Sequence, residues 1–233
     1  MRAQDPIVGL ESIASRIRGD LASKSDARDK ALTASRELIR HCSLSIRAVH
    51  RDDFAAADVS LAAARSLVAG LESGLAPHPD LFVAGYVQDA LKEYAEARTV
   101  YALVRGDELP RPEEIHVPYP AYLNGLGESV GELRRHVLDS LRRGSTDGCE
   151  EVLRYMDDIY TVLATMDFPD ALTGNLRRIT DVARSIVEKT RGDLTYALQQ
   201  QELEKAMAKL ERRLCGPERD ESGPARSGSA GSQ

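Results

Sequence analysis

The stretch YLNGLGESVGELRR, residues Tyr122 to Arg135, does most to decide the fold of this chain. Glu128 and Glu132 are four residues apart in it, so on a helix they project from the same side. An apolar stripe with steps of three or four residues runs through this stretch and beyond it: Leu126, Val130, Leu133, Val137 and Leu141. This period predicts an amphipathic helix that buries one face and carries an acidic pair.

Three glycines, Gly125, Gly127 and Gly131, lie around the acidic pair. Each costs a helix ~1 kcal/mol relative to alanine, so three within seven residues are a substantial loss of helix stability. This loss is tolerable where another helix or a ligand must approach the backbone closely. We therefore expect a close contact on this helix.

A second acidic pair lies upstream in LKEYAEARTVY, residues 91–101, where Glu93 and Glu96 are three residues apart. Apolar residues around this pair are again at helical spacing: Val83, Val87, Ala90, Tyr94, Ala97 and Tyr101. If the two helices pack, four carboxylates converge, and a hard cation such as Mg²⁺ relieves their repulsion. Bound Mg²⁺ can activate water and stabilise charge on a phosphodiester. Spacing alone favours solvated surface acids, because acidic pairs at helical spacing are common, and the metal site becomes a specific expectation only with the family resemblance described below.

The whole chain reads as an all-α protein. Aromatic residues make up 5% and Trp is absent, a composition that favours helix packing over a β-sandwich. Proline and glycine residues mark the ends of the predicted helices, which span about residues 6–51, 52–73, 79–105, 120–143, 145–165 and 170–213. The first of these ranges is either one long helix or a broken pair. We expect one helical domain over residues 1–215 and a disordered Gly/Ser/Pro-rich tail over 216–233.

Charge and cysteine content narrow the class of protein. The net charge is −6, but residues 1–51 carry ten Lys/Arg against six Asp/Glu, whereas residues 52–133 carry five against fourteen. A basic face can therefore meet nucleic acid despite the negative total. The three cysteines follow no metal-ligand spacing, and no apolar run is long enough for a signal peptide or a membrane span. We expect a cytoplasmic protein with reduced thiols and no membrane partner.

Three stretches, in order, resemble the translin family: SRELIRHCSLSIRAVHR at Ser35–Arg51, KEYAEA at Lys92–Ala97, and YLNGLGESVGELRR at Tyr122–Arg135. The first resembles the family's N-terminal helix, which opens Ser-Arg-Asp and ends in His-Arg. The other two resemble the Glu-Tyr-x-Glu-Ala and Tyr-Leu-x-Gly-x-x-Asp-x-x-Gly-Glu-Leu segments of the branch called translin-associated factor X. The resemblance covers roughly residues 15–200.

The resemblance implies a fold and an activity. In that branch four acids bind Mg²⁺ and cut RNA, and the matching positions here are Glu93, Glu96, Glu128 and Glu132. It thus implies a Mg²⁺-dependent endoribonuclease, with Mn²⁺ as an alternative metal, acting on single-stranded or short duplex RNA. It also implies a bundle of about seven helices that closes into a hollow homo-oligomer, a hexamer or octamer. Glu128 stands where the family pattern has Asp, and its additional methylene can displace the carboxylate by ~1 Å.

A basic stripe on the first predicted helix is the candidate nucleic-acid contact. Arg36, Arg40 and Arg47 are spaced by four and seven residues, and Arg51 extends the stripe by one turn. Guanidinium groups bind phosphate oxygens bidentately, so we expect the stripe to contact RNA, although a solvated charged face has the same pattern. The alternative function is a non-catalytic oligomer of the translin type that binds single-stranded RNA or DNA.

Overall fold

The computed structural model describes residues 7 and 9–215 of the chain. Within these residues the secondary structure is helical without strands, which confirms the all-α prediction. The elements are α1 (Leu10–Val49), α2 (Phe54–Leu75), α3 (Pro79–Phe82), α4 (Gly85–Arg105), α5 (Tyr119–Arg142), α6 (Cys149–Ala164), α7 (Asp170–Thr173) and α8 (Leu176–Cys215). The predicted tail over 216–233 lies outside the described residues, so its disorder stays a prediction.

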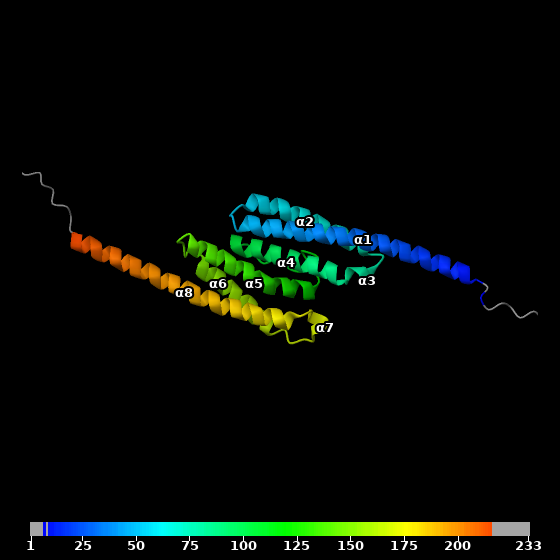
Figure 1. Ribbon diagram of the computed structural model, residues 1–233. Helices are drawn as coiled ribbons and strands as arrows, with labels where there is room; N and C mark the ends of the chain where they lie inside the picture. The colour runs from blue at the N-terminus through cyan, green and yellow to red at the C-terminus, as the bar shows by residue number, and fades with distance from the viewer. Residues whose placement is uncertain (1–6, 8, 216–233) are drawn as a thin grey trace, which may run out of the picture. The chain divides into compact units, whose positions relative to one another are not determined.

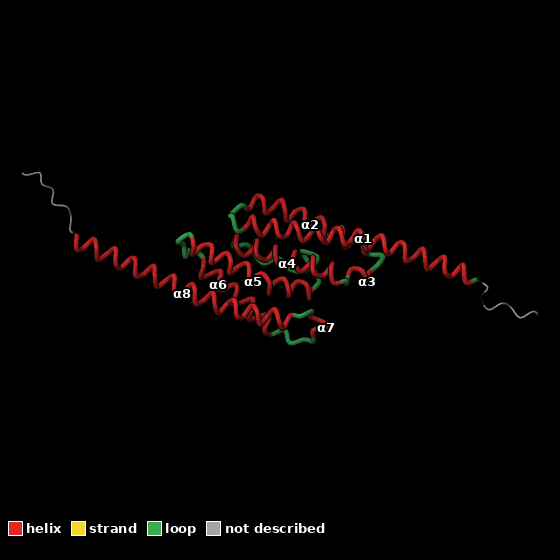
Figure 2. The backbone as a smooth tube through the Cα atoms, viewed as in Figure 1, coloured by secondary structure: helices red, strands yellow, loops and turns green. Residues whose placement is uncertain are grey.

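The chain divides into two units, residues 1–194 and 195–233. In the first unit the helices pack as neighbours in the order α2, α1, α4, α5 and α6, and they are drawn as ribbons in Figure 1 and as a tube in Figure 2. The acidic helices α4 and α5 are therefore central and lie side by side. In the second unit the described residues continue helix α8 as far as Cys215.

The helix boundaries follow the sequence signals with two exceptions. The predicted helix over 79–105 is interrupted, because Ala84 has an extended backbone and separates α3 from α4. The Gln88 side-chain amide donates to the Phe82 carbonyl, 2.8 Å away, and satisfies an acceptor that the interruption frees. Val83, placed by its spacing on the apolar stripe, is instead 69% exposed.

The second exception is the start of the last helix. That helix was predicted to start at about residue 170, but Asp170–Thr173 form the separate single-turn helix α7. Gly174 and Asn175 then adopt left-handed backbone conformations, with φ of 58° and 62°, before α8 begins. The interruption at Ala84 and the separate turn α7 divide two of the six predicted ranges, which gives the eight helices of the described residues; the family resemblance had implied about seven.

Two of the three glycines on α5 allow a close approach. A Cβ atom on Gly125 would lie 2.6 Å from the Lys92 carbonyl oxygen and 3.0 Å from the Glu96 amide nitrogen, both backbone atoms of α4. A Cβ on Gly127 would lie 2.2 Å from Cγ2 of Ile179 on α8. The expected close contact is therefore present on two sides of α5, whereas Gly131 has only an ordinary contact.

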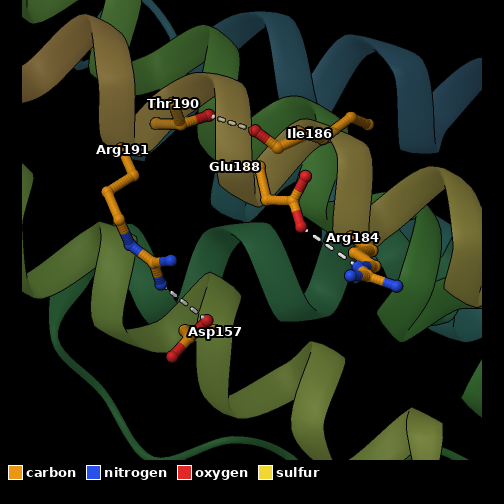
Figure 3. A network of polar contacts seen from close by, with 6 residues as sticks. All are labelled: Asp157, Arg184, Ile186, Glu188, Thr190 and Arg191. Atoms are coloured by element: carbon orange, nitrogen blue, oxygen red, sulfur yellow. Dashed lines mark hydrogen bonds and ion pairs between the residues drawn. The ribbon is translucent and has the colours of Figure 1, made fainter.

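Polar contacts fasten helix α8 within the first unit. On α5, Arg134 donates to Thr190 Oγ1 over 3.0 Å and pairs with Asp193 over 2.7 Å. Arg191 of α8 reaches Asp157 of α6, with 2.9 Å between nitrogen and oxygen (Figure 3). These contacts tie the part of α8 that belongs to the first unit to α5 and α6.

Helix α2 is long and apolar enough, by length and composition alone, to cross a membrane. Its 18-residue window has a mean hydropathy of 1.4. The buried positions of this helix recur every three or four residues: Ala57, Leu61, Ala64, Val68, Leu71 and Leu75. The helix also packs along α1, and its first turn is capped by Asp53, whose side chain accepts from the Ala56 amide. An apolar helix with one buried face is what the core of a helix bundle requires.

We predict that Gly125→Ala lowers the free energy of unfolding by about 1–3 kcal/mol, because the methyl group would collide with the α4 backbone, which cannot move aside like a flexible side chain. The matched control is Gly70→Ala on α2, where a Cβ meets nothing within 4 Å. There the gain in helix propensity should stabilise the protein by up to ~1 kcal/mol. Urea denaturation of both variants measures the difference, and a Gly125→Ala protein as stable as the parent would contradict the close approach.

Candidate metal centre

The close approach of α4 and α5 brings both acidic pairs to one cavity. Glu93 and Glu96 of α4 and Glu128 and Glu132 of α5 all line it, and its volume is about 600 Å³. Gly125 lies about one turn before Glu128 and, having no side chain, lets the backbones of α4 and α5 approach closely. The carboxylates of the two helices are therefore separated by a short gap. The convergence of two acidic pairs expected from their spacing is therefore present.

Three of these carboxylates form a tight group. One oxygen from each of Glu93, Glu96 and Glu128 lies within 4.8 Å of the other two. Glu96 is only 8% exposed, and no hydrogen bond or ion pair neutralises it among the described residues. Burial, and then the charges of the other carboxylates, raise the pKa of Glu96 to about 8. Burial also raises the pKa of Glu93.

This group suits a small divalent cation. Mg²⁺ and Mn²⁺ prefer carboxylate oxygen ligands, and three such oxygens converge here from two helices. A buried carboxylate without a partner is costly to ionise unless it gains a proton or a cation. Glu93, Glu96 and Glu128 would therefore hold the metal, which would take the place of the proton that the raised pKa of Glu96 favours at neutral pH.

Glu132 has a different environment from the other three acids. Its Oε2 lies 2.6 Å from Nε2 of His50, the residue at the end of α1, whose side chain is 4% exposed. Arg135 is a second, longer contact at 3.8 Å. The hydrogen bond with His50, more than any other effect, lowers the pKa of Glu132. Glu132 thus lines the cavity as a carboxylate held by its own partner.

Lys92 also contacts the acidic group, although the sequence analysis gave this lysine no role. Its Nζ lies 2.7 Å from the carboxylate of Glu128 and 3.9 Å from Oε1 of Glu93. Burial alone would lower the pKa of Lys92, but the hydrogen bond and the charge of Glu128 outweigh it, and the pKa is raised. The lysine therefore stays charged beside the group.

The remaining walls of the cavity are basic and apolar. Arg47 of the predicted stripe on α1 lines it, whereas Arg36, Arg40 and Arg51 are exposed and do not. Two further arginines line it from other helices, Arg135 on α5 and Arg178 on α8. The α8 wall is completed by apolar residues at helical spacing: Ile179, Val182 and Ile186. The cavity thus combines carboxylates with guanidinium groups that can bind phosphate oxygens.

Cys42 on α1 is fully buried. Its pKa is raised strongly by burial, and further by the negative charges of Glu93 and Glu96. A thiol with a raised pKa is a poor nucleophile, because the thiolate is the reactive form. Cys42 therefore offers no reactive thiolate beside Glu93 and Glu96.

No family model matches the chain. Among curated proteins it is similar to an uncharacterized protein of Methanocaldococcus jannaschii, MJ0175, with 32% identity over 193 residues that cover 82% of this chain and 85% of the relative. Among solved structures it is similar to AfC3PO, alone and in complex with duplex RNA. In both the identity is 29% and the TM-score 0.74, over 80% of this chain and 97% of that one. Apo-NeC3PO has the same fold at 19% identity, with a TM-score of 0.72 over 84% of this chain and 99% of the other.

We predict that the stability of the metal-free protein falls as the pH rises from about 5 to 8. Folded Glu96 keeps its proton up to a pKa of about 8, whereas the unfolded chain releases it near 4.5, so in this window the unfolded state binds fewer protons. Glu96→Gln should reduce this loss and be more stable than the parent at pH 8. Urea denaturation in EDTA at several pH values tests this. Glu188→Gln, on the exposed face of α8, should keep the parent's pH profile.

Proposed function

The chain belongs to the translin family, and from this membership we propose that it is a Mg²⁺-dependent endoribonuclease that acts on RNA enclosed by an oligomer of identical subunits. The observation that carries the proposal is the group of three carboxylates, with oxygens within 4.8 Å of one another, in a cavity that arginines also line. The complex of AfC3PO with duplex RNA supports RNA as the ligand.

Each acidic residue has a role in this proposal. Glu93, Glu96 and Glu128 hold the divalent cation, Mg²⁺ or Mn²⁺, and Glu132 supplies a fourth oxygen from the same wall of the cavity. When bound, the cation supplies an activated water and stabilises the charge that develops on the phosphodiester. The hydrogen bond from His50 fixes Glu132 in its ionised form, ready to bind a cation or accept a proton.

The basic residues bind the RNA backbone. Arg47, Arg135 and Arg178 come from three helices and line the cavity, so they can hold phosphates on either side of the carboxylates. Arg36, Arg40 and Arg51 extend this basic surface along α1. We propose that six or eight copies assemble so that these surfaces face an enclosed RNA, either single-stranded or a short duplex.

One observation favours a second candidate function, a non-catalytic oligomer that binds single-stranded RNA or DNA. The carboxylate of Glu128 is already engaged by Lys92 at 2.7 Å, which leaves the metal with a competitor for one of its three ligands. If that pair persisted in the presence of Mg²⁺, the cavity would bind phosphates without cleaving them. The two functions share the arginines and differ in the need for metal.

We predict Mg²⁺-dependent cleavage of a fluorescently labelled single-stranded RNA, abolished by EDTA. Changing Glu93, Glu96 or Glu132 to Gln should lower the cleavage rate by at least about 100-fold, because each removes a ligand charge, while RNA binding in EDTA persists. Glu188→Gln should cleave like the parent. If all three variants cleave at the parent rate, the catalytic proposal is wrong; if the parent binds RNA but does not cleave it, the binding function holds.

We predict that Arg36→Ala, Arg40→Ala and Arg47→Ala weaken RNA binding about equally for RNAs of different sequence, because phosphate contacts carry no sequence information. Each lost contact should reduce the slope of log affinity against log salt by roughly 0.7–1. Fluorescence anisotropy between about 50 and 200 mM salt measures this. Arg154→Ala on α6, whose guanidinium pairs with Asp158, is the matched control and should leave the slope unchanged. If all three variants have the same salt-dependence slope as the parent, these arginines do not contact RNA and form an ordinary solvated face.

A further inference from the structure

Lys92 occupies an unusual place for a lysine. It directly precedes Glu93 on α4, yet its side chain turns toward α5 and contacts Glu128, leaving 21% of the side chain exposed. Lysine side chains usually keep the ammonium group in water, so this one is held by the carboxylates it meets. It contacts two of the three proposed metal ligands, Glu128 and Glu93, and the catalytic proposal gives it no role.

We propose that Lys92 is a built-in counter-ion of the metal centre: its ammonium group holds Glu128 in the metal-free protein and competes with the divalent cation for that carboxylate. The proposal rests on the proposed function, since it concerns the same three carboxylates. Lys92 would then determine how much Mg²⁺ the protein needs, without touching the RNA.

The distances support competition. Nζ of Lys92 is 2.7 Å from the Glu128 carboxylate, and an oxygen of that carboxylate is within 4.8 Å of oxygens of Glu93 and Glu96. A Mg²⁺ ion bound to an oxygen of Glu128, at the usual distance of about 2.1 Å, would lie within a few ångströms of the ammonium group. Like charges at such a separation repel strongly in a half-buried site, so each cation lowers the affinity of the other.

The other cations near the cavity do not have this position. Arg135 approaches Glu132, at 3.8 Å, and His50 is also committed to Glu132, at 2.6 Å. Neither pairs with Glu93, Glu96 or Glu128. Arg47 and Arg178 also line the cavity, but among the described residues neither forms an ion pair with these carboxylates. Lys92 can also yield its place, because its four-carbon stem is flexible and 21% of its side chain is exposed to solvent. A rigid guanidinium fork would be harder to displace from a carboxylate.

Metal binding without RNA tests the proposal directly. Mn²⁺ is titrated into the full-length, metal-free protein at constant ionic strength, and free Mn²⁺ is measured by electron paramagnetic resonance. Lys92→Met, which keeps the length of the side chain and removes its charge, should bind Mn²⁺ about tenfold more tightly than the parent. Lys92→Gln should also bind more tightly. Lys92→Arg, which keeps the charge and is harder to displace from a carboxylate, should bind Mn²⁺ no more tightly than the parent.

The control is Lys24→Met on α1, which removes the same charge from an ion pair with Asp80 away from the cavity and should leave the affinity unchanged. Circular dichroism establishes that each variant is folded, and Lys92→Gln serves if Lys92→Met is not. If the parent binds Mn²⁺ and neither neutral variant binds it more tightly, Lys92 is not a competitor and this inference is wrong while the metal centre stands. If neither the parent nor the variants bind Mn²⁺, the proposed metal centre itself fails.

Discussion

The contact between the backbones of α4 and α5 at Gly125 is the constraint on which the rest of the site depends. The absence of a side chain there lets the Lys92 carbonyl and the Glu96 amide approach α5 more closely than a Cβ would allow. The same contact shields Glu96 from water and places Glu128 across from Glu93. Gly125 lowers the helix propensity of α5, but it permits the close packing that crowds the carboxylates and partly buries them.

The crowding is relieved in a different way for each acid. Glu132 gains a hydrogen bond from His50 and becomes easier to ionise, and Glu128 gains the ammonium group of Lys92. Glu96 gains no such partner among the described residues, and its pKa rises to about 8. At neutral pH the innermost carboxylate therefore favours a proton, which a divalent cation entering the group would displace.

The sequence was most informative where a local pattern determines the structure. Helical spacing and proline punctuation predicted the bundle, and the unusual glycines near Glu128 predicted a close contact. His50 and Lys92 were missed because their roles depend on how neighbouring helices turn toward each other: His50 lies 82 residues before Glu132 along the chain. Arg178 was missed for the same reason, since only the packing of α8 brings it to the cavity. The interruption at Ala84 was missed although Gly85, the next residue, disfavours a helix interior.

The second close approach, at Gly127, ties two distant positions of the sequence together. A methyl group at residue 127 would overlap Cγ2 of Ile179 on α8 and crowd Cδ1 of Leu163 on α6. Positions 127 and 179 can therefore not change independently. Among natural relatives, Ala at the first should occur with a smaller residue than Ile at the second, so the pair should show correlated substitution across a separation of 52 residues. The residue of α8 that faces Gly127 in the cavity wall would then vary together with that glycine of α5.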